Sequence, residues 1–364
     1  MDKKLLKNVE YPILIAIILL TILSVTMISS ATNATTSGNF YTTRMQIIWF
    51  CVGAILMLAV ISIDYHSFSG WYKIIYSANI FSLLLVLLAG EKGGGAQRWL
   101  DIGPFTLQPS EFAKLAVVIT LASHLEKKKS LNTPKDLVSV ILHIAPIMLL
   151  IAKQPDLGTS LVLAAISFGM TFAAGLSYKL LGEVICCGLL GLPIFWHFLK
   201  EYQKDRILIF FNPYLDPLGR GYHVIQSKIA IGSGKIFGKG LYKGTQNQLN
   251  FLPVKHTDFI FAVLGEELGF IGGVTLLLLY FVLIYYSLRV AFKARDLLGT
   301  YMVVGIVSMW LFQILVNMGM NMGIMPVTGI PLPFMSYGGS SFLMNMMAAG
   351  VVINVGMRRQ KILF

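Results

Sequence analysis

The sequence predicts an all-α membrane protein with many spans. Of its 364 residues, 56% are hydrophobic and 13% are charged, and the mean hydropathy is +0.73. A water-soluble domain normally carries about 25% charged residues, so the composition excludes a soluble protein. The apolar residues form continuous runs near the roughly 20 residues that a membrane helix needs, whereas a barrel would show short alternating strands.

Ten apolar runs are predicted to span the membrane within one domain, residues 1–364. The domain divides into helices one to seven (1–199), a large extracytoplasmic loop with interfacial helices (200–258) and helices eight to ten (259–364). The fifth run is the weakest, because it is short and contains Pro146, so it could be re-entrant. The ten predicted spans are 11–30, 46–63, 71–89, 111–125, 137–152, 157–176, 178–199, 259–288, 300–322 and 339–357.

Basic residues of the short polar segments gather on one side of this ten-span arrangement. The opposite short loops carry only Arg44, Lys92, Arg98 and Lys153. Because cytoplasmic loops are enriched in Lys and Arg, both termini are predicted to be cytoplasmic. The first run lacks a small-residue cleavage site, so we expect a retained helix rather than a signal peptide. Fourteen residues define the basic side: Lys3, Lys4, Lys7, Lys127, Lys128, Lys129, Lys135, Lys179, Arg289, Lys293, Arg295, Arg358, Arg359 and Lys361.

The longest polar region, residues 200–258, falls on the predicted outer side and is basic. It contains nine Lys or Arg residues and four acidic residues. An anionic partner is indicated, such as phosphate-rich lipid head groups, because Lys and Arg pair strongly with phosphate oxygens. A loop that is only solvated by its charges is the alternative.

Two stretches of this loop, 205–211 and 224–231, mix apolar with polar residues. Such stretches are expected to lie in the membrane interface. They would place Arg206, Gln226 and Lys228 at head-group depth, where a pyrophosphate would sit.

The glycine-rich stretch 232–240 resembles a nucleotide-binding loop only superficially. Its Gly-Lys pairs lack the upstream glycine and the following Ser or Thr of a P-loop, so ATP binding is excluded. Its glycines are expected to allow a compact turn or to let backbone amides approach an anion.

An acid and a base lie together at the start of the fourth predicted span. Glu111 and Lys114 are three residues apart, on one helical face, and Pro109 suits the first turn of that helix. They form either a structural ion pair or part of a polar cavity that opens to the outside.

Asp258 closes the basic loop and precedes the eighth span. Burial raises the pKa of a carboxylate and nearby cations lower it, so Asp258 beside Lys255 could act as a base at neutral pH. The alternative role is an N-cap of the eighth helix. Glu266 and Glu267 are expected two helical turns deeper, about 12 Å along the helix.

Other catalytic chemistries find no support in the residue pattern. The six histidines show no His-x-x-x-His pair and no zinc spacing, so no metal site can be identified. The chain also lacks a Gly-x-Ser-x-Gly nucleophile elbow. A single base with phosphate-binding cations remains.

Six motifs occur in order along nearly the whole chain: Gly95 to Leu100, Gln108 to Lys114, Gln154 to Thr159, Gly219 to Ser227, His256 to Gly269 and Gly329 to Ser341. In these motifs the chain resembles the SEDS family (shape, elongation, division and sporulation) of bacterial peptidoglycan glycosyltransferases. The segment 244–253 is similar to the elongation-type, RodA-like branch, while division and sporulation members stay possible.

The resemblance implies ten spans, an extracytoplasmic site and an essential aspartate at Asp258. The family joins lipid II units: the GlcNAc 4-hydroxyl of the acceptor attacks the anomeric carbon of the donor MurNAc, and undecaprenyl pyrophosphate leaves. We expect Asp258 to be the base and Arg98, Arg206 and Lys228 to contact the pyrophosphate. Substrate binding is further assigned to Glu111, Lys114 and Gln226. The loop from Pro331 to Ser341 is expected to re-enter the outer face and shape a lipid groove, with a plain turn as the alternative.

The resemblance also implies a location and partners. We expect a multi-pass protein of the bacterial cytoplasmic membrane with lipid II as substrate, surrounding membrane lipids, no nucleic acid, and a class B penicillin-binding protein that cross-links the product. No cofactor is certain, and a divalent cation, Mg²⁺ or Mn²⁺, could assist. Two other functions stay open: a flippase or transporter for lipid II, and a non-catalytic scaffold for a transpeptidase.

Overall fold

The computed structural model describes residues 8–33, 40–93, 96–102, 105–128, 131, 133–198, 201–252 and 254–359. The predicted residues Lys3, Lys4, Lys7, Gly95, Lys129, Lys200 and Lys361 lie outside these ranges.

A helix overlaps each of the ten predicted spans. Seven of the described helices are long and apolar enough to cross a membrane: α2, α3, α5, α7, α13, α14 and α15. The structure therefore supports a helical membrane protein, while the number ten stays a prediction. The ten helices are α2 (Tyr11–Asn33), α3 (Tyr41–Ser62), α5 (Tyr72–Ala89), α6 (Pro109–Glu126), α7 (Pro134–Lys153), α8 (Leu157–Ala173), α9 (Tyr178–Phe198), α13 (Ile260–Phe292), α14 (Leu297–Met322) and α15 (Gly339–Met357).

Local sequence signals explain where several helices begin. Thr133 and Asp136 form a capping box at α7, so the weakest predicted span is a 20-residue helix that continues through Pro146. Asp156 accepts a hydrogen bond from Thr159 N at the start of α8, and Asp296 accepts one from Gly299 N at the start of α14.

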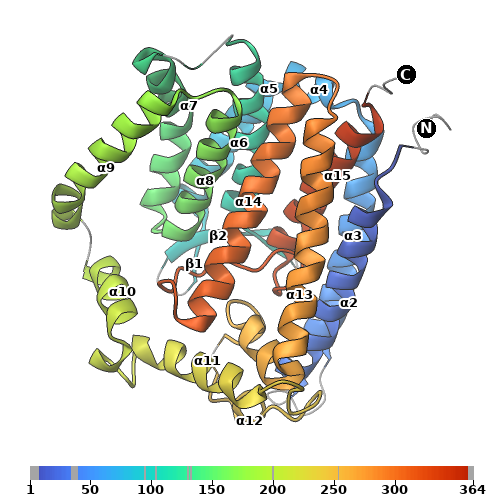
Figure 1. Cartoon of the computed structure of the whole chain (residues 1–364), viewed down its shortest axis with the longest axis vertical. Helices are drawn as coiled ribbons and strands as arrows, with labels where there is room; N and C mark the ends of the chain where they lie inside the picture. Colours follow the sequence, from blue (N-terminus) through green and yellow to red (C-terminus); the bar gives the residue numbers. More distant parts are fainter. Residues whose placement is uncertain are drawn as a thin grey trace.

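The bundle is arranged around α14 and α15. Most of each helix is buried, whereas α3 and α5 expose apolar side chains such as Ile55 and Leu88 on their outer faces. A water-soluble protein would rarely expose so much apolar surface, and lipid contact accounts for it. The start of α2 and the end of α15 lie at one end of the molecule, and α11 and α12 lie at the other (Figure 1).

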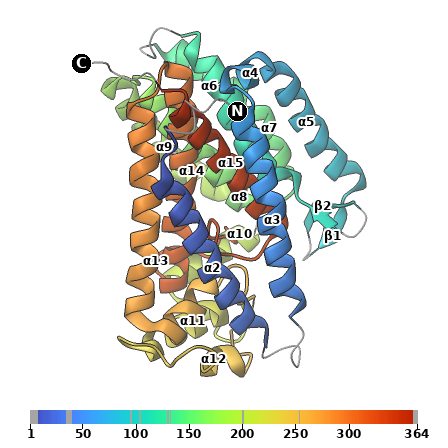
Figure 2. The ribbon, with the colours of Figure 1, turned by 90° about the vertical axis from the view of Figure 1, so that its right-hand side faces the viewer.

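A small sheet departs from the all-α prediction. Strands β1 (Glu91–Gly93), β2 (Ala96–Ile102) and β3 (Phe105–Leu107) pair antiparallel in that order, with Leu100 opposite Leu107. The sheet lies beside α5, away from α13 (Figure 2). The sequence predicts a loop here, because strands this short show no clear alternation of apolar and polar side chains.

The long polar loop is mostly helical. It contains α10 (Glu201–Phe211), the 3-10 helix η1 (Pro213–Leu215), α11 (Arg220–Gly234) and α12 (Thr245–Gln248). Val224, Ser227 and Ala230 are buried where α11 packs on α13 and α14, and its position at the membrane interface stays a prediction. The remaining short helix, α4 (Tyr65–Gly70), lies between α3 and α5.

Candidate functional site

Asp258 is held by the polar face of α14. Its main-chain carbonyl accepts a hydrogen bond from Asn317 Nδ2 at 3.1 Å and another from Asn321 Nδ2 at 3.0 Å. Asn317 Nδ2 also donates to the Ile330 carbonyl at 2.7 Å. Both asparagine side chains are fully buried, so these amides fix the backbone of Asp258 against α14 and the loop that follows it.

The two carbonyls before Asp258 are held by the loop 323–338. Tyr337 N donates to the His256 carbonyl at 2.9 Å, and Ser336 Oγ donates to the Thr257 carbonyl at 2.6 Å. Three successive carbonyls are therefore bound from one side. This arrangement orients the carboxylate of Asp258 without using any of its oxygens.

The loop 323–338 lies inside the bundle. Ile330, Phe334 and Met335 are at most 2% exposed. Ser24 Oγ donates to the Met335 carbonyl and Tyr280 Oη to the Pro333 carbonyl, both at 2.7 Å. Protein therefore buries this irregular backbone and pairs its carbonyls, while re-entry into the membrane stays a prediction.

The carboxylate of Asp258 is half-buried and faces this loop. A Cβ atom built on Gly329 would lie 3.6 Å from Asp258 Oδ2. Burial raises the pKa of Asp258 to about 6, while the positive charge of Arg206 lowers it. The N-cap position of α13 belongs to Phe259, with no capping side chain, so the N-cap alternative for Asp258 is wrong.

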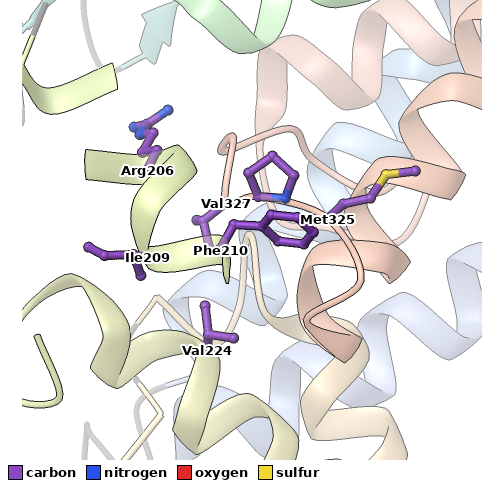
Figure 3. A pocket seen from close by; sticks show the side chains of 7 residues that line it. Arg206, Ile209, Phe210, Val224, Met325 and Val327 are labelled. Carbon is purple, nitrogen blue, oxygen red and sulfur yellow. The ribbon is translucent and has the colours of Figure 1, made fainter. Parts of the chain in front are cut away.

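Arg206 stands at the edge of an apolar hollow that α10, α11 and the loop after α14 form (Figure 3). The space between these side chains measures about 330 Å³ when the adjoining open solvent is included. The other lining residues are Ile209, Phe210, Val224, Met325, Pro326 and Val327. A cation beside apolar side chains matches a ligand that has an anionic head and a hydrocarbon chain.

The other predicted contacts on α11 lie near the same loop. Lys228 is exposed and its side chain crosses Gly323, where a Cβ atom would lie 2.5 Å from Lys228 Nζ. Gly323 ends α14 with φ 70°, a left-handed conformation that favours glycine. A side chain at this position would also collide with Lys228. Gln226 is half-buried on α11.

Arg98 is placed differently from its predicted role. Its Nε donates to the Gln154 carbonyl at 3.0 Å, and its Nη2 donates to the Pro155 carbonyl. These bonds tie β2 to the turn before α8. We therefore leave Arg98 out of the pyrophosphate contacts proposed below.

The predicted ion pair of α6 is formed. Lys114 Nζ lies 2.7 Å from Glu111 Oε2, and the two residues are 1% and 4% exposed. A buried pair of this kind satisfies both charges and needs no other ligand to explain it. Its assignment to substrate binding stays a prediction.

Asp156 is a polar centre that the residue pattern did not single out. Its carboxylate accepts hydrogen bonds from Thr159 N and Oγ1, from Ser110 Oγ and from Gln108 Nε2, at 2.9 to 3.3 Å. The next glycine, Gly158, packs against the Thr328 carbonyl. Two of the resembling motifs therefore meet behind the loop that faces Asp258.

The asparagines of α14 were also missed, although the sequence carried a signal for them. Gln313, Asn317 and Asn321 recur every four residues in an otherwise apolar helix, which places them on one face. Polar side chains repeated in this way inside a membrane helix indicate a buried polar contact.

The glycine-rich stretch forms a compact turn against α13. Lys239 N and Gly240 N donate to the carbonyls of Glu266 and Glu267, both at 3.0 Å. Among the described residues, no group of three or more His, Cys, Asp or Glu side chains could hold a metal ion.

Comparison with known proteins supplies the wider context. A family model described as cell cycle protein, FtsW/RodA/SpoVE, matches residues 10–361. The peptidoglycan glycosyltransferase MrdB of Escherichia coli K12 is 42% identical over 311 residues, which cover 85% of this chain and 84% of that protein. The peptidoglycan glycosyltransferase RodA of Treponema pallidum is 34% identical, covering 96% of this chain and 98% of its own.

Two solved structures share the fold. A chain from a peptidoglycan synthase complex, described as coordinating polymerization and crosslinking, has a TM-score of 0.83 and 33% identity, covering 96% of this chain and 98% of that one. The rod shape determining protein RodA of Thermus thermophilus has a TM-score of 0.73 and 28% identity, covering 97% and 98%.

Proposed function

The chain belongs to the FtsW/RodA/SpoVE family of cell cycle proteins, and from this membership we propose how it builds glycan strands. It is a multi-pass membrane protein and a peptidoglycan glycosyltransferase. The observation that carries the proposal is the half-buried carboxylate of Asp258, whose pKa is about 6, next to the cation of Arg206 and an apolar hollow.

Asp258 is the general base in this proposal. The GlcNAc 4-hydroxyl of one lipid II attacks the anomeric carbon of the MurNAc of another. The new bond joins that oxygen to the anomeric carbon, the bond to the pyrophosphate oxygen breaks, and Asp258 takes the hydroxyl proton. A hydroxyl is a weak nucleophile, and a positioned base contributes about 10²- to 10⁴-fold to such a step. A pKa of about 6 leaves Asp258 mostly ionised at neutral pH.

Arg206 and Lys228 bind the leaving pyrophosphate. Negative charge grows on that group as its bond to the sugar breaks, so cations held nearby lower the barrier. A guanidinium can donate two parallel hydrogen bonds to phosphate oxygens. The apolar hollow beside Arg206 would then take the first part of the hydrocarbon chain. Gln226, Glu111 and Lys114 are assigned to substrate binding, as contacts to the sugars.

A divalent cation is not assigned to a protein site. Asp258 is one carboxylate among cations, and a resident Mg²⁺ or Mn²⁺ needs several oxygen ligands. An ion that enters with the pyrophosphate of the substrate is compatible with this arrangement, and no step is derived from it.

The proposal extends to topology, role and partner. The end that carries α11 and α12 faces the extracytoplasmic side, both termini are cytoplasmic, and the product serves cell elongation. A class B penicillin-binding protein is the expected partner. The positive-inside distribution and the similarity to a chain from a peptidoglycan synthase complex support these points.

A reconstitution with lipid II tests the proposal. The full chain and its Asp258→Asn variant would be purified in detergent, alone and with a class B penicillin-binding protein that co-purifies, and mixed with labelled lipid II. We expect glycan polymer from the wild type and none above background from Asp258→Asn. The same proteins in vesicles would be tested for movement of lipid II across the bilayer.

Folding of the variant is checked by its elution volume and thermal unfolding. A folded Asp258→Asn protein that polymerises at the wild-type rate would overturn the base assignment. A wild type that moves lipid II but makes no polymer would instead establish the flippase alternative.

A further inference from the structure

Two adjacent carboxylates in α13 lie outside the proposed chemistry. Glu266 and Glu267 are fully buried. They come just before Gly269, whose backbone (φ 65°, ψ −156°) divides α13 into two helical parts. Burying an ionised carboxylate costs much free energy unless hydrogen-bond donors surround it. The donors around Glu266 and Glu267 therefore indicate which segments these residues hold in place.

Glu266 accepts hydrogen bonds from several residues of the segment 239–247. Its Oε1 accepts hydrogen bonds from Lys239 Nζ at 2.8 Å, Gln246 N at 2.9 Å and Thr245 Oγ1 at 3.2 Å. Its Oε2 accepts one from Asn247 N at 3.1 Å. All of these donors belong to the part of the polar loop that leads toward Asp258.

Glu267 binds the same segment and joins it to α2. Its Oε1 accepts hydrogen bonds from Ser30 Oγ at 2.5 Å and from Asn247 Nδ2 at 3.0 Å, and its Oε2 accepts one from Tyr242 N at 3.2 Å. Asn247 therefore contacts both carboxylates, one through its main-chain amide and one through its side chain. Both acids lie about two turns into α13, as expected, and both bind the loop 239–247.

Asn247, which contacts both carboxylates, is also bonded to Lys255. Lys255 is 5% exposed. Its Nζ donates to the Asn247 carbonyl at 2.7 Å and to Asn250 Oδ1 at 2.8 Å. Lys255 precedes Asp258 by three residues, within a turn in which Thr257 N and Phe259 N both point to the Val254 carbonyl.

We propose that Glu266 and Glu267, acting through Asn247 and Lys255, are positioning residues that set Asp258 for proton transfer. The carbonyls of 256–258 are held by α14 and the loop 323–338, and Lys255 ties the same turn to Asn247 and Asn250. Removing either support leaves the turn with one set of bonds. This inference rests on the proposed role of Asp258 as the base.

The test measures lipid II polymerisation by the full chain. Lys255→Met removes both hydrogen bonds, and Glu267→Gln replaces a carboxylate by an amide whose NH₂ group opposes donors. We expect each variant to lower kcat by about 10- to 100-fold, because a displacement near 1 Å can cost that much. KM for lipid II should stay within about threefold, since Arg206 and the apolar hollow are unchanged.

A double variant separates positioning from general destabilisation. If Glu267 and Lys255 act on one step through Asn247, the combined variant should be no slower than the worse single variant. Lys255→Arg, which keeps a cation with several donors, should recover most of kcat. Lys243→Met and Glu183→Gln change exposed side chains and serve as matched controls, with wild-type rates expected.

Each outcome decides the matter. Lys255→Met with wild-type kcat, or two single losses that multiply, would overturn the positioning role. A rise in KM alone would assign Lys255 to substrate binding instead. The proposal that Asp258 is the base is tested by a different result: it fails if the Asp258→Asn variant still polymerises lipid II. If Glu267→Gln does not fold, the comparison of Lys255→Met with Lys255→Arg still tests the inference.

Discussion

The side-chain amide of Asn317 lies 3.1 Å from the main-chain carbonyl of Asp258, and it also reaches the Ile330 carbonyl at 2.7 Å. One buried amide thus joins the predicted base to the loop that its carboxylate faces. Asn317 bonds main-chain carbonyls and not the carboxylate, so it acts on catalysis through the positions of Asp258 and of this loop.

Replacing Asn317 by Leu should slow polymerisation and destabilise the fold. The change removes the donor for the Ile330 carbonyl and one of two donors for the Asp258 carbonyl. An unpaired buried carbonyl costs about 1–3 kcal/mol, so the thermal midpoint should fall. We expect kcat to drop about tenfold, measured with lipid II. Leu315→Ala, on the exposed face of the same helix, is the control. Equal rates for Asn317→Leu and wild type would show that Asp258 does not need this bond.

Asp258→Asn should abolish polymerisation yet stabilise the protein above pH 6. The pKa of Asp258 is about 6 in the folded protein, against an ordinary value of 3.8. Below pH 3.8 the group is protonated in both states, and its cost is absent. The cost grows between the two values and is complete above pH 6, where it reaches up to about 3 kcal/mol. Thermal unfolding in detergent at pH 8 and pH 4.5 measures the difference. A variant that is less stable than wild type at pH 8 would contradict the burial of this carboxylate.

The pH dependence of kcat/KM should show an acid limb near pH 6. Below that pH, Asp258 is protonated and cannot accept the hydroxyl proton. Arg206→Ala removes the charge that lowers the pKa of Asp258, so the limb should move to higher pH. Lys204→Ala, on the same helix, removes a cation that pairs with Glu201 and should leave the limb in place. A limb that Arg206→Ala leaves unmoved would separate Arg206 from Asp258.

The pair Glu111 and Lys114 should be more sensitive to single changes than to a double one. Glu111→Gln or Lys114→Met leaves one buried charge without its partner, which costs about 3–5 kcal/mol. The double variant leaves neither charge, so most of the stability should return. Thermal unfolding measures both effects. Polymerisation by the double variant then tests the substrate role, because a wild-type rate would exclude the pair from the sugar site.

The parts of the fold that local sequence determines were predictable. Apolar runs of membrane length located the helices, and the three-residue spacing of Glu111 and Lys114 was enough to predict their ion pair. Asp258 stood out because an acid next to an apolar run is rare.

Contacts between distant segments were not predictable in this way. Asn317 meets a carbonyl 59 residues earlier in the chain, and Ser30 meets Glu267 across 237 residues. No local pattern encodes such pairs, since each residue alone looks like a tolerated polar side chain in a helix. The same reason explains the position of Arg98. Its positive charge suggested a phosphate contact, but in the fold its guanidinium donates to the carbonyls of Gln154 and Pro155.

Two glycines of α13 offer a matched comparison of backbone strain. Gly269 has φ 65° and ψ −156°, a region that side chains rarely adopt, and a Cβ atom there would lie 2.3 Å from Gly238 N. Around Gly273, one turn further on, no atom of another turn or segment lies within 4 Å of the same position.

Gly269→Ala should therefore destabilise the protein by at least about 1–3 kcal/mol from backbone strain alone. Gly273→Ala should be neutral or stabilising by up to about 1 kcal/mol, because alanine favours a helix. Since Gly269 packs directly against Gly238 in the turn 235–240, its variant should lose polymerase activity at temperatures at which the Gly273 variant still works. Equal stability of the two variants would show that the kink is not needed.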